Sequence, residues 1–187
     1  QFPLNFADSS LAFRSGNPKP VGNPAEILAM GDKFYSELHP ETDVFWKFMR
    51  EHEMLDVESK PGKAGGGYCS RIASMRSPFI FANFNGTAHD VKVITHEAGH
   101  AFAFHVNRDR APSESMTPSL EGCEVHSMAM EFFAEDWAED FFGTDADKFV
   151  NPDCIFGTSL QGTSYYLTSA IEGKDIATLC TYFDYFY

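Results

Sequence analysis

The chain has 187 residues, of which 43% are hydrophobic and 22% charged, as is typical of one globular domain with a buried core. Its formal net charge of −13 repels phosphate backbones, which argues against nucleic acid as a partner. The sequence contains no apolar run of about eighteen residues, so we expect no membrane-spanning segment and no membrane partner.

The cysteines and the first residues bear on where the protein works. The four cysteines form no Cys-x-x-Cys pair and fit neither a zinc ribbon nor a dense disulfide scaffold; they are Cys69, Cys123, Cys154 and Cys180. We therefore expect a reducing compartment and a cytoplasmic location. The sequence begins at Gln1 with neither an initiator Met nor the charged and apolar pattern of a signal peptide, so we expect an internal piece of a longer protein.

The first third of the chain predicts two helices after a looped segment. Residues 1–24 hold four prolines and two glycines, which favour an extended or looped path. A helix is predicted after Asn23, with Pro24 at its first position, and a second helix is predicted after His39-Pro40. The glycine-rich segment Gly62–Gly67 lacks the Gly-Lys-Ser/Thr order of a phosphate loop, so we expect a hairpin or a close backbone approach.

The middle of the chain predicts one strand and two long helices. Pro78–Phe84 has the apolar run of a short buried strand, and Asn85-Gly86 predicts a turn after it. The next helix is predicted to run from a cap at Thr87 to about Asn107, with the Thr87 hydroxyl and the Asp90 carboxylate binding its free amides. An amphipathic helix is predicted over about 119–142, ending at Gly143. Residues 151–187 predict no clear element.

His96-Glu97-Ala98-Gly99-His100 is the motif that carries chemistry. Four residues advance a helix by about 400°, so His96 and His100 stand on one face and their imidazoles can converge on one zinc ion. Glu97 is displaced from that face but can reach a water on the open coordination position, as a general base requires. The alternative is a buried helix with two hydrogen-bonded histidines.

A catalytic zinc ion has three protein ligands, so a third ligand is expected on the following helix. The acidic candidates there are Glu121, Glu124 and Glu131. Glu124 and Glu131 are seven residues apart and face the same way, and the connection after His100 is long enough to bring the two helices side by side. Spacing alone does not separate Glu121 from Glu124.

Five segments in the same order resemble the M3 family of zinc oligopeptidases, and most closely its oligoendopeptidase F and Pz-peptidase branch. The likeness covers about residues 16–149. The segments are Asn17–Pro20, Lys63–Cys69, Phe79–Gly86, Thr95–Phe102 and Glu121–Phe133.

The resemblance implies a role for each residue of the site. His96, His100 and Glu124 would hold one zinc ion, and Glu97 would be the catalytic base. Glu131 would orient a ligand, the alternative being a solvated helix carboxylate. The implied fold is mainly α with a small β-sheet near the metal site, part of a zincin-type, two-lobed helical oligopeptidase. Residues 1–149 would be the central part of the catalytic domain, with 150–187 unassigned.

The resemblance also implies how substrate binds. The strand containing Phe81, Ala82 and Asn83 would pair with an extended peptide substrate, and a plain core strand is the alternative. Two departures matter. Ala103 stands where many members have a histidine, and the Tyr and His groups that stabilise the oxyanion come from a later helix that 150–187 does not resemble. Tyr165 and Tyr166 are too close to Glu124 to be assigned that role.

The predicted function is therefore a zinc metalloendopeptidase acting on short peptides, or a central fragment of one that binds zinc and is weakly active or inactive by itself. Two alternatives follow from the same residues. One is a non-catalytic domain that zinc stabilises. The other is a zinc hydrolase acting on a different substrate, against which the resemblance argues.

Overall fold

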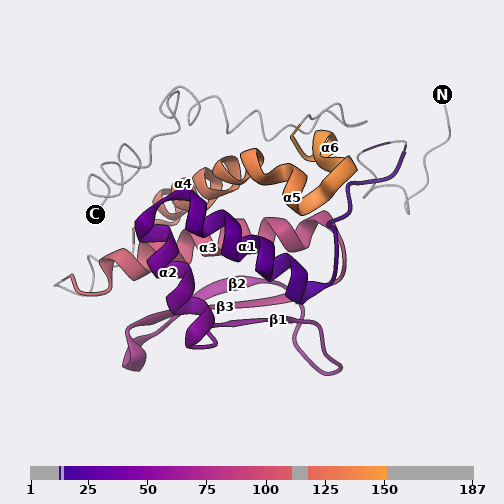
Figure 1. The fold of residues 1–187 in the computed structure, drawn as a ribbon. Coiled ribbons are helices and arrows are strands. Elements are labelled where there is room, and N and C mark those ends of the chain that lie inside the picture. Colours follow the sequence, from indigo (N-terminus) through magenta and orange to yellow (C-terminus); the bar gives the residue numbers. More distant parts are fainter. Residues whose placement is uncertain (1–12, 14, 111–117, 151–187) are drawn as a thin grey trace.

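A computed structural model describes residues 13, 15–110 and 118–150, and the structure below concerns these residues. This part is mainly helical and contains one three-stranded sheet, with the helices layered over one face of the sheet (Figure 1). The predicted mainly-α fold with a small sheet is confirmed. None of the helices described is both long and apolar enough to cross a bilayer.

The first two helices begin where the sequence predicted. Helix α1, Pro24–Leu38, starts at a capping box: Asn23 Oδ1 accepts from the amide of Glu26 at 3.2 Å, and Glu26 Oε2 accepts from the amide of Asn23 at 2.7 Å. Helix α2, Pro40–Glu51, also has proline at its start. The Tyr35 hydroxyl donates to the carbonyl of Ile94 at 2.9 Å, which joins α1 to the long helix that carries the motif.

The sheet has the strand order β1-β3-β2, with β1 Leu55–Glu58, β2 Tyr68–Ile72 and β3 Ser77–Phe84. Strand β3 is the predicted strand; β1 runs parallel to it and β2 antiparallel. Phe81 pairs with Asp56 on one side and with Tyr68 on the other, so β3 lies in the middle of the sheet. The expectation that Phe81, Ala82 and Asn83 pair with a peptide is therefore corrected. Strand β3 is a core strand with a neighbour on each side, and on the β2 side the edge of the sheet is β2 itself.

The glycine-rich loop is tied to the sheet by two side chains. Lys63 Nζ donates to the carbonyls of Asp56 at 3.0 Å and Glu58 at 2.8 Å. Asn83 Nδ2 donates to the carbonyls of Ala64 and Gly66 at 2.8 and 2.9 Å. The loop thus approaches the sheet through its backbone, as one of the two alternatives for this segment predicted.

Helix α3, Ala88–Asn107, has the predicted start and length, with Thr87 at its N-cap, but the cap contacts differ from those predicted. The Thr87 hydroxyl makes no cap and donates instead to Asn85 Oδ1 at 2.6 Å. The buried Asp90 carboxylate accepts from the amides of Asn85 and Gly86, the latter at 2.7 Å. Thr87 is thus the N-cap residue as predicted, but the predicted hydrogen bonds to the helix amides are wrong: the Asp90 carboxylate binds the turn before the helix, and the Thr87 hydroxyl supports the same turn.

The predicted helix over about 119–142 is broken in the structure. Helix α4, Leu120–Phe133, is followed by a 3₁₀ turn at Ala134–Trp137 and by α5, Ala138–Phe142. The break lies where the Trp137 indole donates to Glu37 of α1 at 2.7 Å. Helix α5 ends at Gly143, as predicted, where φ is 53°. Another 3₁₀ turn, Gly143–Asp145, leads to α6, Ala146–Val150. The unassigned residues 151–187 lie outside the described part.

Helices α3 and α4 lie side by side (Figure 1), and their backbones come into contact at Gly99. A Cβ at Gly99 would lie 2.6 Å from Ser127 Cα and 2.7 Å from the carbonyl oxygen of His126. Real side chains do not tolerate such distances to backbone atoms, because the backbone cannot move without moving the helix. The glycine inside the motif therefore sets how closely the two helices approach.

Replacing Gly99 with alanine tests this approach. Helix propensity alone predicts a gain of about 1 kcal/mol in the free energy of unfolding. We expect instead a loss of about 1–3 kcal/mol, because the new methyl group overpacks the crossing. Chemical denaturation measures the difference. Gly65→Ala is the matched control, since nothing lies within 4 Å of its Cβ position. A Gly99→Ala chain more stable than the unaltered chain would contradict the close crossing.

His105 gives the described part a predicted pH dependence. Burial, aided by the charge of Arg108 and opposed by Asp109, lowers the pKa of His105 from 6.5 to about 4. Its Nδ1 has no hydrogen-bond partner among the described residues. As the pH falls below about 6.5 the unfolded chain takes up the proton first, so stability decreases toward pH 4, at most by about 1.4 kcal/mol per pH unit.

The measurement is the free energy of unfolding at pH 6.5 and pH 4.5, for the unaltered chain and for His105→Gln. The variant should lose less stability on acidification than the unaltered chain. Equal losses in both chains would show that this histidine does not contribute.

Candidate metal centre

His96 and His100 project from one face of α3, as their spacing predicted. Their ring centroids are 4.9 Å apart, and the ring planes are nearly perpendicular at 86°. Both side chains are partly buried, with 27% and 19% of their surface exposed. Two imidazoles so placed can reach one ion from two directions.

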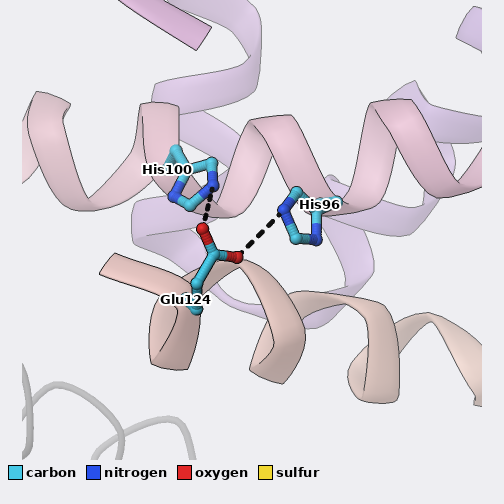
Figure 2. A group of neighbouring side chains, drawn as sticks. All are labelled: His96, His100 and Glu124. Atoms are coloured by element: carbon cyan, nitrogen blue, oxygen red, sulfur yellow. Dashed lines mark ion pairs between the residues drawn. The ribbon is translucent and has the colours of Figure 1, made fainter. Parts of the chain in front are cut away.

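Glu124 reaches across from α4 and lies between the two imidazoles (Figure 2). Its Oε2 is 3.3 Å from His96 Nε2, and its Oε1 is 3.8 Å from His100 Nε2. One ligand atom from each of the three residues lies within 4.8 Å of the others. Two nitrogens and one carboxylate oxygen form the donor set of many catalytic zinc sites, so the residues present fit that metal.

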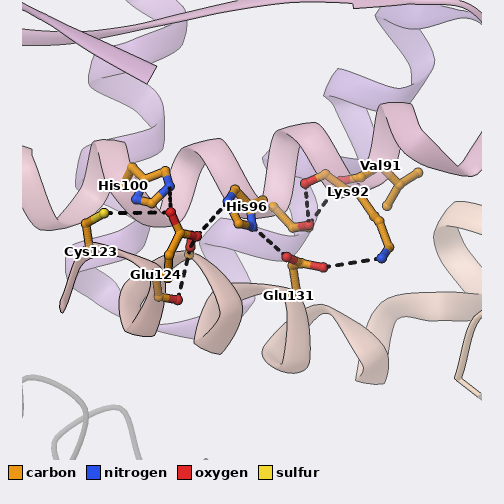
Figure 3. Close-up of polar contacts among 9 residues, drawn as sticks. Val91, Lys92, His96, His100, Cys123, Glu124 and Glu131 are labelled. Carbon is orange, nitrogen blue, oxygen red and sulfur yellow. Dashed lines mark hydrogen bonds and ion pairs between the residues drawn. The ribbon is translucent and has the colours of Figure 1, made fainter. Parts of the chain in front are cut away.

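The ring of His96 is held from its far side by Glu131, seven residues beyond Glu124 on α4. His96 Nδ1 and Glu131 Oε1 are 2.6 Å apart, and Lys92 Nζ is 3.8 Å from Glu131 Oε2 (Figure 3). The Glu131 side chain is only 12% exposed, which does not suit a solvated helix carboxylate. Glu131 thus lies where a carboxylate that orients His96 must lie.

The ring of His100 also has a partner on α4. It donates a hydrogen bond to the backbone carbonyl of Cys123, the residue before Glu124. Each histidine therefore has a second contact with α4 besides the one with Glu124. Nothing in the sequence pattern signalled this carbonyl, because any residue type at position 123 would supply it.

The charges around the site shift the pKa of each histidine differently. Burial lowers the pKa of His96, but the hydrogen bond and charge of Glu131, with the charges of Glu97 and Glu124, raise it above its usual value. Burial and the neighbouring charge of His96 lower the pKa of His100. Both effects follow from two imidazoles sharing a small acidic site.

Glu97 is half-buried on the side of α3 that faces the sheet. Burial and the charge of Glu124 raise its pKa, while His96 and a hydrogen bond from the backbone N–H of Cys69 oppose the rise. Cys69 belongs to β2, so the sheet contacts Glu97 while α4 supplies Glu124. A carboxyl group with a raised pKa accepts a proton more readily than an ordinary one. The sequence did not predict the contact with Cys69.

A cavity of about 330 Å³ opens beside His96 and Glu97. Its apolar part is formed by Val93 and Met128, and polar side chains surround it. This volume is enough for a side chain of a bound molecule next to the two residues.

The sequence matches one protein family over most of the described part. The family model described as Peptidase family M3 matches residues 33–148. No curated protein matches the sequence significantly.

Solved structures give close matches over most of the chain. A putative oligoendopeptidase F from Bacillus anthracis str. Ames is 47% identical with a TM-score of 0.77, covering 80% of this chain and 27% of that one. A second putative oligoendopeptidase F is 49% identical with a TM-score of 0.76, covering 79% and 26%. Pz peptidase A, solved with an inhibitor, is 47% identical with a TM-score of 0.76, covering 80% and 26%. The chain thus spans about a quarter of the length of these proteins.

The centre predicts that metal binding stabilises the chain. Zinc at a hundredfold excess over its Kd should add about 2.7 kcal/mol to the free energy of unfolding. Glu124→Ala should remove most of this gain, whereas Glu121→Ala, the alternative that spacing left open, should retain it. Thermal denaturation with and without zinc measures the effect. If Glu121→Ala loses the gain and Glu124→Ala retains it, the third ligand is Glu121 and the assignment to Glu124 is wrong.

Proposed function

This chain belongs to peptidase family M3, and on that premise we propose that it is part of a longer protein, a zinc metalloendopeptidase that cleaves internal bonds of short peptides. The observation that supports this most is the donor group of His96, His100 and Glu124 next to the half-buried carboxylate of Glu97. One zinc ion bound there would lower the pKa of a water molecule and polarise a peptide carbonyl.

Glu97 is the proposed base and acid of the reaction. Its carboxylate takes the proton of the attacking water and then delivers it to the amine nitrogen of the leaving peptide. The Cys69 N–H fixes the Glu97 carboxylate from the side of the sheet, and burial keeps its pKa above the usual value. The carboxylate is therefore oriented for both proton transfers before the substrate binds. His96, His100 and Glu124 keep their roles as ligands.

Strand β2 is the proposed place for the substrate backbone. It lies at the edge of the sheet, and Tyr68, Ser70 and Arg71 are exposed there. The edge of a strand binds an extended peptide through main-chain hydrogen bonds, which suits peptides of varied sequence. Because Cys69 in this strand also binds Glu97, a peptide on β2 would lie next to the base.

A second candidate is a domain that zinc stabilises without catalysis. The observation that favours it is that the donor group joins two helices, so an ion bound there would hold α3 and α4 together. The Tyr and His groups expected from a later helix would then lie elsewhere in the longer protein. Loss of an oxyanion donor typically reduces turnover about 10²–10³-fold, so the 187-residue chain by itself is expected to be weakly active. The cytoplasmic location stays a prediction.

Glu97→Gln separates the two candidates. The variant should retain bound zinc, since Glu97 is not a ligand, and should lose peptide hydrolysis at least about 10²-fold, since the amide accepts no proton. Hydrolysis of internally quenched peptides and metal analysis of the same samples measure both. Glu139→Gln, on the exposed surface of α5, is the control.

Undiminished hydrolysis by Glu97→Gln would contradict the proposed role of the base. If neither the unaltered chain nor the longer protein that contains it cleaves any peptide, and zinc removal only unfolds the chain, then zinc serves to stabilise the domain and the second candidate is correct.

A further inference from the structure

Ser127 lies one helical turn beyond Glu124 on α4 and is fully buried. Its Oγ is 3.0 Å from Glu124 Oε2 and 3.1 Å from the backbone carbonyl oxygen of the same residue. A serine hydroxyl has one hydrogen to donate, and the carboxylate is the stronger of the two acceptors. Ser127 therefore contacts the one ligand that comes from α4.

Glu124 needs such a contact more than the other ligands. Its side chain is 50% exposed, compared with 27% for His96 and 19% for His100. A half-exposed glutamate has several rotamers open to it, and fixing one of them costs up to about 2 kcal/mol of conformational entropy. A hydrogen-bond donor that already restricts the Glu124 side chain before the ion binds reduces the conformational entropy that is lost on metal binding.

The hydrogen bond selects the rotamer that points into the site. The oxygen that Ser127 contacts, Oε2, is the one that lies 3.3 Å from His96 Nε2. With this oxygen fixed, Oε1 faces His100 at 3.8 Å, so the carboxylate lies between both imidazoles. The contact thus acts on the orientation of the ligand and not only on the packing of α4.

Water competes little for this hydroxyl. Ser127 stands at the helix crossing, where a Cβ on Gly99 would lie 2.6 Å from Ser127 Cα. A hydrogen bond shielded from solvent is stronger than an exposed one. The same crossing that brings Glu124 to the histidines therefore protects the contact that orients it.

We propose that Ser127 is a positioning residue that holds the Glu124 carboxylate ready for the metal ion. This inference rests on the proposed function, because it assumes that His96, His100 and Glu124 bind zinc. With it, each of the three ligands has a hydrogen-bond partner from α4: Glu131 for His96, the Cys123 carbonyl for His100, and Ser127 for Glu124.

The test is the zinc affinity of the full 187-residue chain, measured by competition with a chelator of known affinity. Ser127→Ala should bind zinc about tenfold more weakly, as is common when a partner of a metal ligand is removed. Ser127→Gly removes the same hydroxyl without adding bulk and should show the same loss, so either variant suffices if the other does not fold. Ser36→Ala is the matched control, since its Oγ donates to the Lys33 carbonyl on the exposed surface of α1.

A double-mutant cycle separates positioning from packing. If Ser127 acts through Glu124, Ser127→Ala should cause no further loss of zinc affinity in a Glu124→Ala chain. An unchanged affinity in Ser127→Ala, or an equal loss in both backgrounds, would overturn the inference. Zinc binding that depends on Glu124 but not on Ser127 refutes this inference alone, whereas an unaltered chain that binds no zinc refutes the proposed function.

Discussion

The backbone contact between α3 and α4 at Gly99 is the constraint on which the rest of the site depends. A single methyl group there would meet α4 at 2.6 Å, so the helices can approach this closely only because position 99 has no side chain. The approach places Glu124 of α4 against His96 and His100 of α3. On its other flank α3 packs on the sheet, which binds Glu97 through β2. Helix α3 thus carries His96, Glu97 and His100, with α4 supporting the two histidines and the sheet supporting Glu97.

The sequence predicted those elements whose signals are local. The start of α1 was predictable because Pro24 and its apolar stripe lie within a few residues, and β3 was predictable from its apolar run. Strands β1 and β2 were missed because both are short and exist through their pairing with β3, and because β2 is largely exposed. The same gap caused the error at Phe81: the sequence of a strand does not tell whether a neighbour occupies its edge. The break at Ala134–Trp137 includes a residue that contacts Glu37, a hundred residues away, and no local signal marks that contact.

The site divides in the same way. The order His96-Glu97-His100 lies within about one turn of one helix, so its geometry followed from helical spacing. The third ligand did not follow, because Glu121 and Glu124 are one turn apart and only the packing of α4 on α3 distinguishes their positions; the family resemblance supplied that choice. The partners Ser127 and Cys69 had no sequence signal. A serine inside a helix and a backbone amide in a strand become part of the site only through tertiary contacts.

The proposed site requires that α3 and α4 together bind one ion through two imidazoles and one carboxylate. A crystal structure of the zinc-loaded chain, with anomalous diffraction measured at the zinc edge, tests it most directly. One strong peak is expected within about 2.0–2.2 Å of His96 Nε2, His100 Nε2 and a Glu124 carboxylate oxygen. A peak at any other place, or one in which Glu121 replaces Glu124, would contradict it.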